Sequence, residues 1–124
     1  MTVVGWISHK GGTGRTVALA NAAYHLASLG RDVVCVDLDL ASPTMGSVLG
    51  LPDIDRGADV GTHSFLDGTI PPTEVEDHLL SVWESPTLSQ PSNAGLFALL
   101  PGERGRGDFD RAEEYRPGDL GEAI

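Results

Sequence analysis

The first part of the chain combines two short apolar runs with one helical pattern between them. Residues 2–8 are mostly β-branched or aromatic, as in a strand that is buried on both faces. Residues 16–29 carry leucine and alanine at helical spacing, and Gly30 follows at a position where helices commonly end. Residues 33–36 form a second apolar run. This order predicts one βαβ unit with parallel strands and a right-handed crossover.

The rest of the chain has a weaker pattern and many turn residues. Ser42 and Pro43 are typical of an N-cap and a first helical residue, and they predict a short helix that ends at Gly50. Residues 51–73 predict a loop with one short helix. Further predicted elements are a helical turn from Thr73 to His78 with Thr73 as its cap, strands over 79–83 and 95–100, and a loop over 101–107.

Composition limits the class of protein. A chain of 124 residues with 40% hydrophobic residues forms at most one domain and has enough apolar surface for a core. No apolar run approaches the ~20 residues that a membrane-spanning helix needs. Cys35 is the sole cysteine, which excludes an internal disulfide framework and a multi-cysteine metal site. These features predict a cytoplasmic protein.

The net charge of −10 is unevenly distributed along the chain. The first 36 residues contain Lys10, Arg15 and Arg31 against a single acidic residue, whereas acidic residues dominate afterwards. The acidic balance argues against broad electrostatic binding of nucleic acid, and no membrane-targeting amphipathic helix is evident at the end of this chain. An anionic ligand would therefore be attracted to the amino-terminal part, which contains Lys10, the only lysine.

A glycine-rich segment, HKGGTGRT, lies between the first predicted strand and the helix. Its three glycines leave backbone N–H groups open to a phosphate, and the positive end of the following helix points at the same place. Arg15 adds a full charge, and Thr16 offers the hydroxyl that holds Mg²⁺ in phosphate loops. The predicted nucleotide-binding residues are Lys10, Gly11, Gly12, Thr13, Gly14, Arg15, Thr16 and Val17.

The spacing of this segment distinguishes between known kinds of nucleotide loop. In the general pattern G-x-x-x-x-G-K-[ST], Lys10 would replace the first glycine and Arg15 the lysine. The variant K-G-G-x-G-K-[ST] fits better, because only Arg15 departs from it. A dinucleotide-binding G-x-G-x-x-G pattern is excluded, since it requires glycine where the chain has Val17. A merely flexible turn is the weaker alternative, because it has no need of two cations and a hydroxyl.

Two carboxylates follow the second predicted strand in the segment VDLDLASP. Ligands of open α/β sheets bind outside the carboxyl ends of the strands, which places Asp37 and Asp39 beside the glycine loop. A carboxylate there can hold Mg²⁺ through a water molecule or orient the water that attacks a γ-phosphate. Ordinary turn chemistry explains a single aspartate after a strand, but explains the pair less well.

Together, KGGTGRT and VDLDLASPTMG resemble the ParA/MinD family of deviant Walker A ATPases in the SIMIBI class, especially a subgroup of the KGGVGR type. The resemblance is specific over residues 1–50 and implies an α/β P-loop NTPase fold with a parallel sheet flanked by helices. It implies that residues 1–124 are the N-terminal portion of one CobQ/CobB/MinD/ParA-type nucleotide-binding domain. Residues 51–94 would be a variable, loop-rich insert, and the segment GLFALLPGE would be the strand that follows it.

The same resemblance implies ligands and roles. ATP, with Mg²⁺, would lie between two subunits of an ATP-dependent homodimer of the full-length protein. Lys10 would reach the partner's phosphates, Asp39 would orient the attacking water, and Arg15 would stabilise charge. Thr16 and Asp37 would be the metal-associated residues. The implied activity is ATP hydrolysis that operates a nucleotide-dependent dimerisation switch.

Two departures from the family leave alternatives open. Arg15 replaces the usual loop lysine with a planar group, which favours nucleotide binding over efficient hydrolysis. After Leu100 no apolar strand ends in Asp-x-x-x-Gly, so the domain is predicted to be truncated before its Walker B strand. The alternatives are a hydrolysis-deficient nucleotide sensor or a truncated remnant. A phosphotransferase on the same fold is less favoured, because the related tyrosine kinases carry a tyrosine-rich tail and this chain has two tyrosines.

Overall fold

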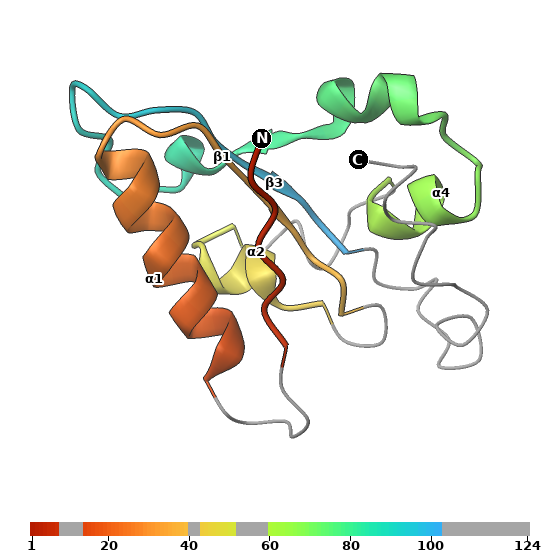
Figure 1. Ribbon diagram of the computed structural model, residues 1–124, viewed down its shortest axis with the longest axis horizontal. Helices are drawn as coiled ribbons and strands as arrows, with labels where there is room; N and C mark the ends of the chain where they lie inside the picture. The colour runs from red at the N-terminus through yellow and green to blue at the C-terminus, as the bar shows by residue number, and fades with distance from the viewer. Residues whose placement is uncertain (8–13, 40–42, 52–59, 103–124) are drawn as a thin grey trace.

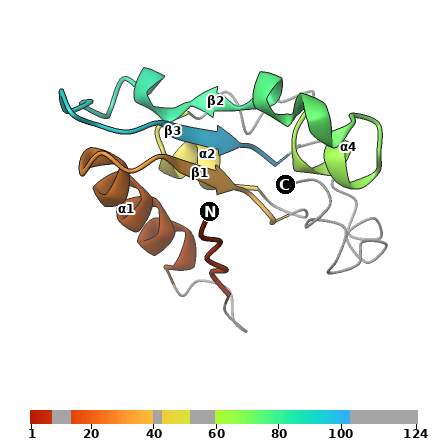
Figure 2. The same ribbon diagram turned by 45° about the horizontal axis from the view of Figure 1, so that its top comes forward.

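A three-stranded sheet with helices on both faces forms the centre of the protein (Figures 1 and 2). The computed structural model describes residues 1–7, 14–39, 43–51 and 60–102. The strands are β1 (Val33–Val36), β2 (Leu80–Ser81) and β3 (Phe97–Leu100), and their order across the sheet is β1-β3-β2. The α/β class predicted from the sequence is confirmed.

The sheet is mixed, so the prediction of a wholly parallel sheet is wrong. β1 and β3 are parallel, with Val33 opposite Phe97, whereas β2 is antiparallel to β3, with Leu80 opposite Leu99. Parallel pairing of consecutive strands needs a crossover that returns the chain to the same end of the sheet. Residues 82–96 contain only one turn of 3₁₀ helix, η2 (Val82–Glu84), and lead directly from β2 into an antiparallel partner.

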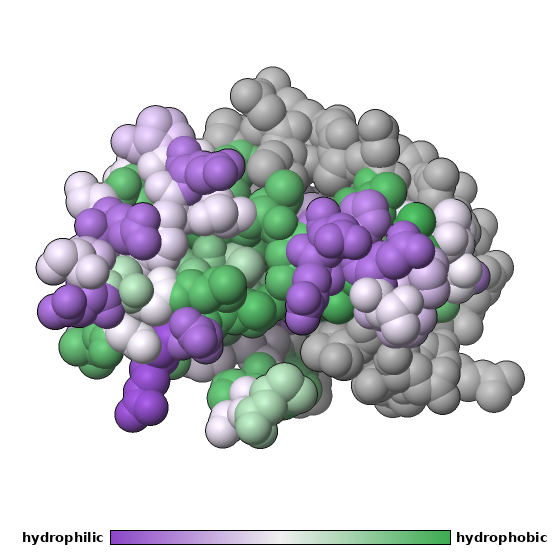
Figure 3. Space-filling view, turned by 90° about the horizontal axis from the view of Figure 1, so that it is seen from above, coloured by the Kyte–Doolittle hydropathy of each residue, from purple (hydrophilic) through white to green (hydrophobic). Residues whose placement is uncertain are grey.

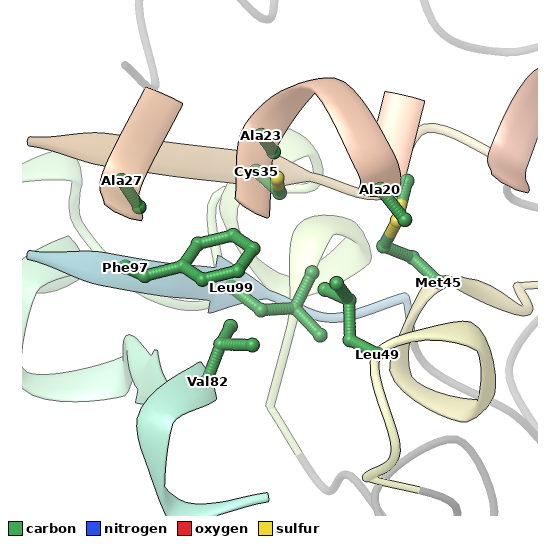
Figure 4. Close-up of a cluster of buried hydrophobic side chains, with 9 residues drawn as sticks. All are labelled: Ala20, Ala23, Ala27, Cys35, Met45, Leu49, Val82, Phe97 and Leu99. Atoms are coloured by element: carbon green, nitrogen blue, oxygen red, sulfur yellow. The ribbon is translucent and has the colours of Figure 1, made fainter. Parts of the chain in front are cut away.

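The helix predicted over residues 16–29 is confirmed as α1 (Arg15–Ser28). Its buried positions are all alanines, and such small side chains let the helix lie close to the sheet. Gly30 has φ 88°, a left-handed conformation that favours glycine and ends the helix as predicted. Figure 4 shows the resulting core between α1 and the sheet. It contains Ala20, Ala23, Ala27, Cys35, Met45, Leu49, Val82, Phe97 and Leu99.

The strand predicted over residues 2–8 is not formed in the described part, residues 1–7. This segment pairs with no strand, and its side chains are exposed, with Val3 at 75% and Ile7 at 85%. Apolar, β-branched residues form a strand only when a neighbouring strand accepts and donates backbone hydrogen bonds. Within the described residues β1 pairs with β3 alone, so the expected βαβ unit lacks its first strand. Seen from above, exposed hydrophobic surface lies between hydrophilic areas (Figure 3).

A short helix, α2 (Met45–Val48), follows β1 and packs against α1. Gly50 has φ 81° and ends this helix as predicted. The proposed cap Ser42 lies outside the described residues, but the predicted start is wrong because Thr44 occupies the N-cap position without a side-chain cap bond. The backbone N–H groups at this helix start are bound instead by a carboxylate from β1, as described below.

On the second face of the sheet, α4 (Thr62–Leu66) and the 3₁₀ helix η1 (Pro72–His78) pack around Leu100 and Val36, while Val34 of β1 stays 49% exposed. The short helix expected within residues 51–73 is confirmed by α4, and η1 confirms the helical turn that ends at His78. The cap assigned to Thr73 is wrong, because η1 begins at Pro72 and has no side-chain cap bond. The second core cluster contains Phe65 and Leu100, with Val36, Val60, Ile70, Val75 and Leu79 packed against them.

The strands predicted late in the chain are confirmed in shortened form. Residues 79–83 yield only β2, because the chain enters η2 after Ser81, and residues 95–100 yield β3. Of the loop predicted over 101–107, the described part is Pro101 and Gly102, which form no helix or strand. In the described part of the chain, no helix is long and apolar enough to cross a membrane.

Candidate functional site

The start of α1 has the features of an anion-binding helix terminus. Gly14 is its N-cap, in a left-handed conformation with φ 77° and ψ 15°, and the first helical bond runs from the Ala18 N–H to the Gly14 carbonyl. In this described helix, no side chain caps the N-terminus and no acidic residue lies in the first turn. The first N–H groups of a helix have no intrahelical acceptor and carry the positive end of its dipole. An anion is the natural partner for such a terminus.

Four of the eight predicted nucleotide-binding residues lie in this described terminus. Arg15 and Thr16 are half-buried in the first turn of α1, and Val17 is 52% exposed. Lys10, Gly11, Gly12 and Thr13 lie outside the described residues. The predicted loop therefore leads into a helix that begins where the sequence pattern requires.

Asp37 is the best-defined polar side chain at the carboxyl end of β1. It is 6% exposed, and its carboxylate accepts N–H bonds from the backbone of three described residues. Oδ1 accepts from Asp39 at 3.0 Å, and Oδ2 accepts from Thr44 at 3.1 Å and from Met45 at 3.0 Å. This carboxylate therefore acts as a remote cap that binds the start of α2 to the end of β1.

The cap also connects Asp37 with the helix that follows the glycine loop. Met45 donates its N–H to Asp37, and its side chain packs in the same cluster as Ala20 of α1 (Figure 4). Thr16 lies one helical turn before Ala20, so the two residues share a face of α1. Thr16 and Asp37, the two metal-associated residues predicted from the sequence, are therefore linked indirectly, through Met45, Ala20 and one turn of α1.

Asp39 lies just beyond this cap and is exposed. Its N–H bond to Asp37 holds the backbone between the two aspartates in a tight turn. The structure therefore gives the pair different environments, with Asp37 buried and bonded to the backbone and Asp39 at the surface. These environments suit different roles, because a buried carboxylate orients its neighbours and an exposed one can meet a ligand or a water molecule.

The carboxyl ends of β1 and β3 are joined by Thr62, which belongs to none of the predicted motifs. The Thr62 hydroxyl donates to the Asp37 carbonyl at 2.9 Å and lies 3.3 Å from the Pro101 carbonyl, which also accepts the Thr62 N–H at 2.9 Å. Next to this junction, Pro43 is buried against Gly102, where a Cβ would overlap the proline ring. A threonine in a loop-rich segment carries no sequence signal for this role.

The described residues contain no group of three or more His, Cys, Asp or Glu that could hold a metal ion. Mg²⁺ bound with a nucleotide needs no such group, because it commonly keeps several waters and takes one or two protein ligands beside phosphate oxygens. A hydroxyl from Thr16 and a carboxylate from Asp37 match that requirement in kind. A metal cage built from protein ligands alone is not present in this part of the chain.

The chain is similar to a protein described as a cytosolic Fe-S cluster assembly factor NUBP2 homolog from Trichoplax adhaerens, with 36% identity over 81 residues. The match covers 65% of this chain and 28% of the relative, so the chain spans well under half of that protein's length. No family model matches the chain. No solved structure matches it either. The similarity supports the ParA/MinD-like class of P-loop NTPases at the level of the superfamily.

Proposed function

We propose that this chain is part of a Mg²⁺-ATP-binding protein of the ParA/MinD-like class that acts as a nucleotide-dependent dimerisation switch. The observation that carries the proposal is the uncapped start of α1, with left-handed Gly14 directly after the sequence KGGT. The Trichoplax relative is described as cytosolic, in agreement with the cytoplasmic location expected from this sequence.

In the proposed complex the residues from Lys10 to Val17 bind the phosphates. The glycines leave the backbone N–H groups accessible, and the start of α1 adds its dipole. Lys10 contributes a point charge that reaches the phosphates bound to a partner subunit. Arg15 contributes a planar group that can bind two phosphate oxygens at once.

Thr16 and Asp37 are the residues that would hold Mg²⁺. When bound, the metal neutralises charge on the phosphate oxygens. The Thr16 hydroxyl is placed at the first turn of α1, and the Asp37 carboxylate would act through a water, because three backbone N–H groups already fix its orientation. Asp39, which is exposed, would orient the water that attacks the γ-phosphate.

The second candidate is a nucleotide sensor that binds ATP without efficient hydrolysis. Arg15 favours it, because a guanidinium differs in shape and hydration from the ammonium group that the motif normally supplies. Both candidates share ATP binding and differ in phosphate release. An ATP-dependent homodimer of the full-length protein belongs to both.

The cysteine content of this chain does not favour iron–sulfur cluster binding. The relative is described as a cluster assembly factor, and iron–sulfur clusters are usually held by cysteine thiolates. The sole cysteine of this chain, Cys35, is buried inside β1, and burial raises the pKa of its thiol to about 11. A thiol that stays protonated and inaccessible does not offer a cluster ligand.

The binding step is tested by titrating a fluorescent ATP analogue into the full chain with Mg²⁺ and, separately, with EDTA. Replacing Arg15 by alanine should weaken binding at least tenfold, which corresponds to about 1.4 kcal/mol, because its guanidinium would bind the phosphates held by its own subunit. Arg31→Ala is the matched control, since it removes an exposed cation beyond the far end of α1, and it should stay within twofold of the wild type. Equal affinities for all three proteins would refute the proposed phosphate loop.

The choice between the two candidates rests on Arg15. Arg15→Lys restores the usual loop residue and should raise the rate of Mg²⁺-dependent phosphate release by about tenfold if hydrolysis is limited at this position. Light scattering of the full-length protein with and without ATP measures dimerisation. If the wild type binds ATP but neither protein releases phosphate, the sensor is the correct candidate.

A further inference from the structure

Thr62 lies at the point where the two parallel strands end. It is 1% exposed, and its hydroxyl donates to the Asp37 carbonyl while its N–H donates to the Pro101 carbonyl. The last bond between the two segments before this point runs from the Asp37 N–H to the Leu100 carbonyl at 3.1 Å. Thr62 therefore continues the connection between β1 and β3 beyond the sheet, through a residue from a different part of the chain.

Through this bond, Thr62 acts on the carboxylate of Asp37. A hydrogen bond to the carbonyl of Asp37 restricts the backbone that carries the side chain, and the side chain in turn binds the N–H groups of Thr44 and Met45. The Asp37 carboxylate is thus held from two directions, by its own backbone and by the start of α2. Two such restraints define the orientation of a carboxylate more closely than one.

Thr62 belongs to a segment that is itself fastened to the sheet. Thr62, His63, Ser64 and Phe65 are all buried, and Phe65 packs with Leu100 in the cluster on the second face. In Figures 1 and 2, α4 lies toward the end of the sheet where β1 and β3 finish. Part of the predicted insert over residues 51–94 is therefore structural support for the carboxyl ends of these strands.

We infer that Thr62 is a positioning residue for the metal-associated carboxylate Asp37, and that it couples the 60–66 segment to the proposed nucleotide site. The inference rests on the proposed function for its effect on ATP, but the restraint on Asp37 is independent of nucleotide. Thr62 makes no hydrogen bond to the Thr16 hydroxyl or to the Asp37 carboxylate. It acts through the backbone carbonyl of Asp37.

The first measurement is amide hydrogen exchange of Thr44 and Met45 in the full chain without nucleotide. Thr62→Val keeps the side-chain shape and removes the hydroxyl, whereas Thr62→Ser keeps the hydroxyl. Exchange at these two amides should accelerate at least fivefold in Thr62→Val and stay within twofold in Thr62→Ser. Equal protection in both variants would overturn the inference, whether or not the protein binds ATP.

The second measurement is the ratio of ATP affinities with Mg²⁺ and with EDTA. Thr62→Val should lower this ratio at least fivefold and leave the affinity in EDTA within twofold, because only the metal-dependent part of binding uses Asp37. Val82→Ala is the control for lost stability, since Val82 is fully buried in the other core cluster. It should lower the unfolding midpoint and leave the ratio unchanged.

The outcomes separate the inference from the proposed function. A wild-type chain that binds no ATP refutes the proposed function, while the exchange measurement still decides the role of Thr62. A wild type that binds ATP, together with a Thr62→Val variant that loses affinity equally with Mg²⁺ and with EDTA, refutes the positioning role. Loss of the Mg²⁺ effect in Thr62→Val, with rescue in Thr62→Ser, supports it.

Discussion

Asp37→Asn removes the charge that joins β1 to α2 while leaving the side chain almost the same size. The carboxylate accepts three backbone N–H bonds, and the amide that replaces it has one acceptor oxygen. That oxygen can keep the N–H donors of Thr44 and Met45, which share Oδ2. The donor of Asp39 then faces an NH₂ group and must turn to solvent.

The magnitude follows from these three bonds. Hydrogen bonds to a charged group contribute about 1.5–3 kcal/mol each and neutral ones about 0.5–1.5 kcal/mol, so the two retained bonds weaken by about 1 kcal/mol apiece. The bond to the partly buried Asp39 N–H is lost, and water replaces part of it. The expected cost of Asp37→Asn is about 3 kcal/mol, a large share of the ~5–15 kcal/mol that stabilises a typical protein.

The assay is urea unfolding followed by tryptophan fluorescence. Trp83 is a suitable reporter because it packs edge-on against Tyr24 and Phe97, with ring centroids 5.9 and 5.4 Å apart. With a urea dependence of about 2 kcal/mol per M, the midpoint of Asp37→Asn should fall by about 1.5 M. Asp39→Asn, which changes the exposed aspartate, should alter stability by less than about 0.5 kcal/mol. Equal midpoints for the two variants would show that the Asp37 carboxylate does not hold α2 in place.

Two further predictions concern the sheet and its core. Gly95→Ala should destabilise the protein by about 3 kcal/mol in the same unfolding assay, because the new Cβ would overlap the Arg31 carbonyl, whereas Gly68→Ala, at φ 78° with open space around it, should cost about 1 kcal/mol. Burial raises the Cys35 thiol pKa from 9.0 to about 11, so only the unfolded state loses this proton between those pH values. Stability should therefore fall by up to about 1.4 kcal/mol per pH unit there, and Cys35→Ala should remove that part of the slope. The same pH dependence of stability in the wild type and in Cys35→Ala would contradict the second prediction. An equal loss of stability in Gly95→Ala and Gly68→Ala would contradict the first.

The local elements near the start of the chain could be predicted because their signals are local. Alanine and leucine at helical spacing, followed by Gly30, define α1 to within one residue at each end. The apolar run over residues 33–36 matches β1, and Gly50 ends α2 where expected. Each of these signals depends on the chain's own conformational preferences, which tertiary contacts do not need to create.

The wrong predictions of secondary structure have a different physical cause. Residues 2–8 have the composition of a buried strand, yet residues 1–7 are exposed and unpaired, because a strand exists only with a partner along its edge. The orientation of β2 was likewise decided by a connection without a crossover helix. The cap assigned to Thr73 was wrong because η1 begins at Pro72.

At the candidate site the same division holds. The sequence alone determined which functional groups are available at the site, because motif spacing is a property of the chain. They are a glycine loop with Lys10 and Arg15, a hydroxyl at Thr16 and two aspartates after a strand. Only the tertiary structure decided that Asp37 is buried as a cap for α2 while Asp39 is exposed. It also brought Thr62 to the ends of β1 and β3, 25 positions from Asp37. Hydrogen bonds between distant segments depend on how the sheet and its covering helices pack, and no local pattern encodes them.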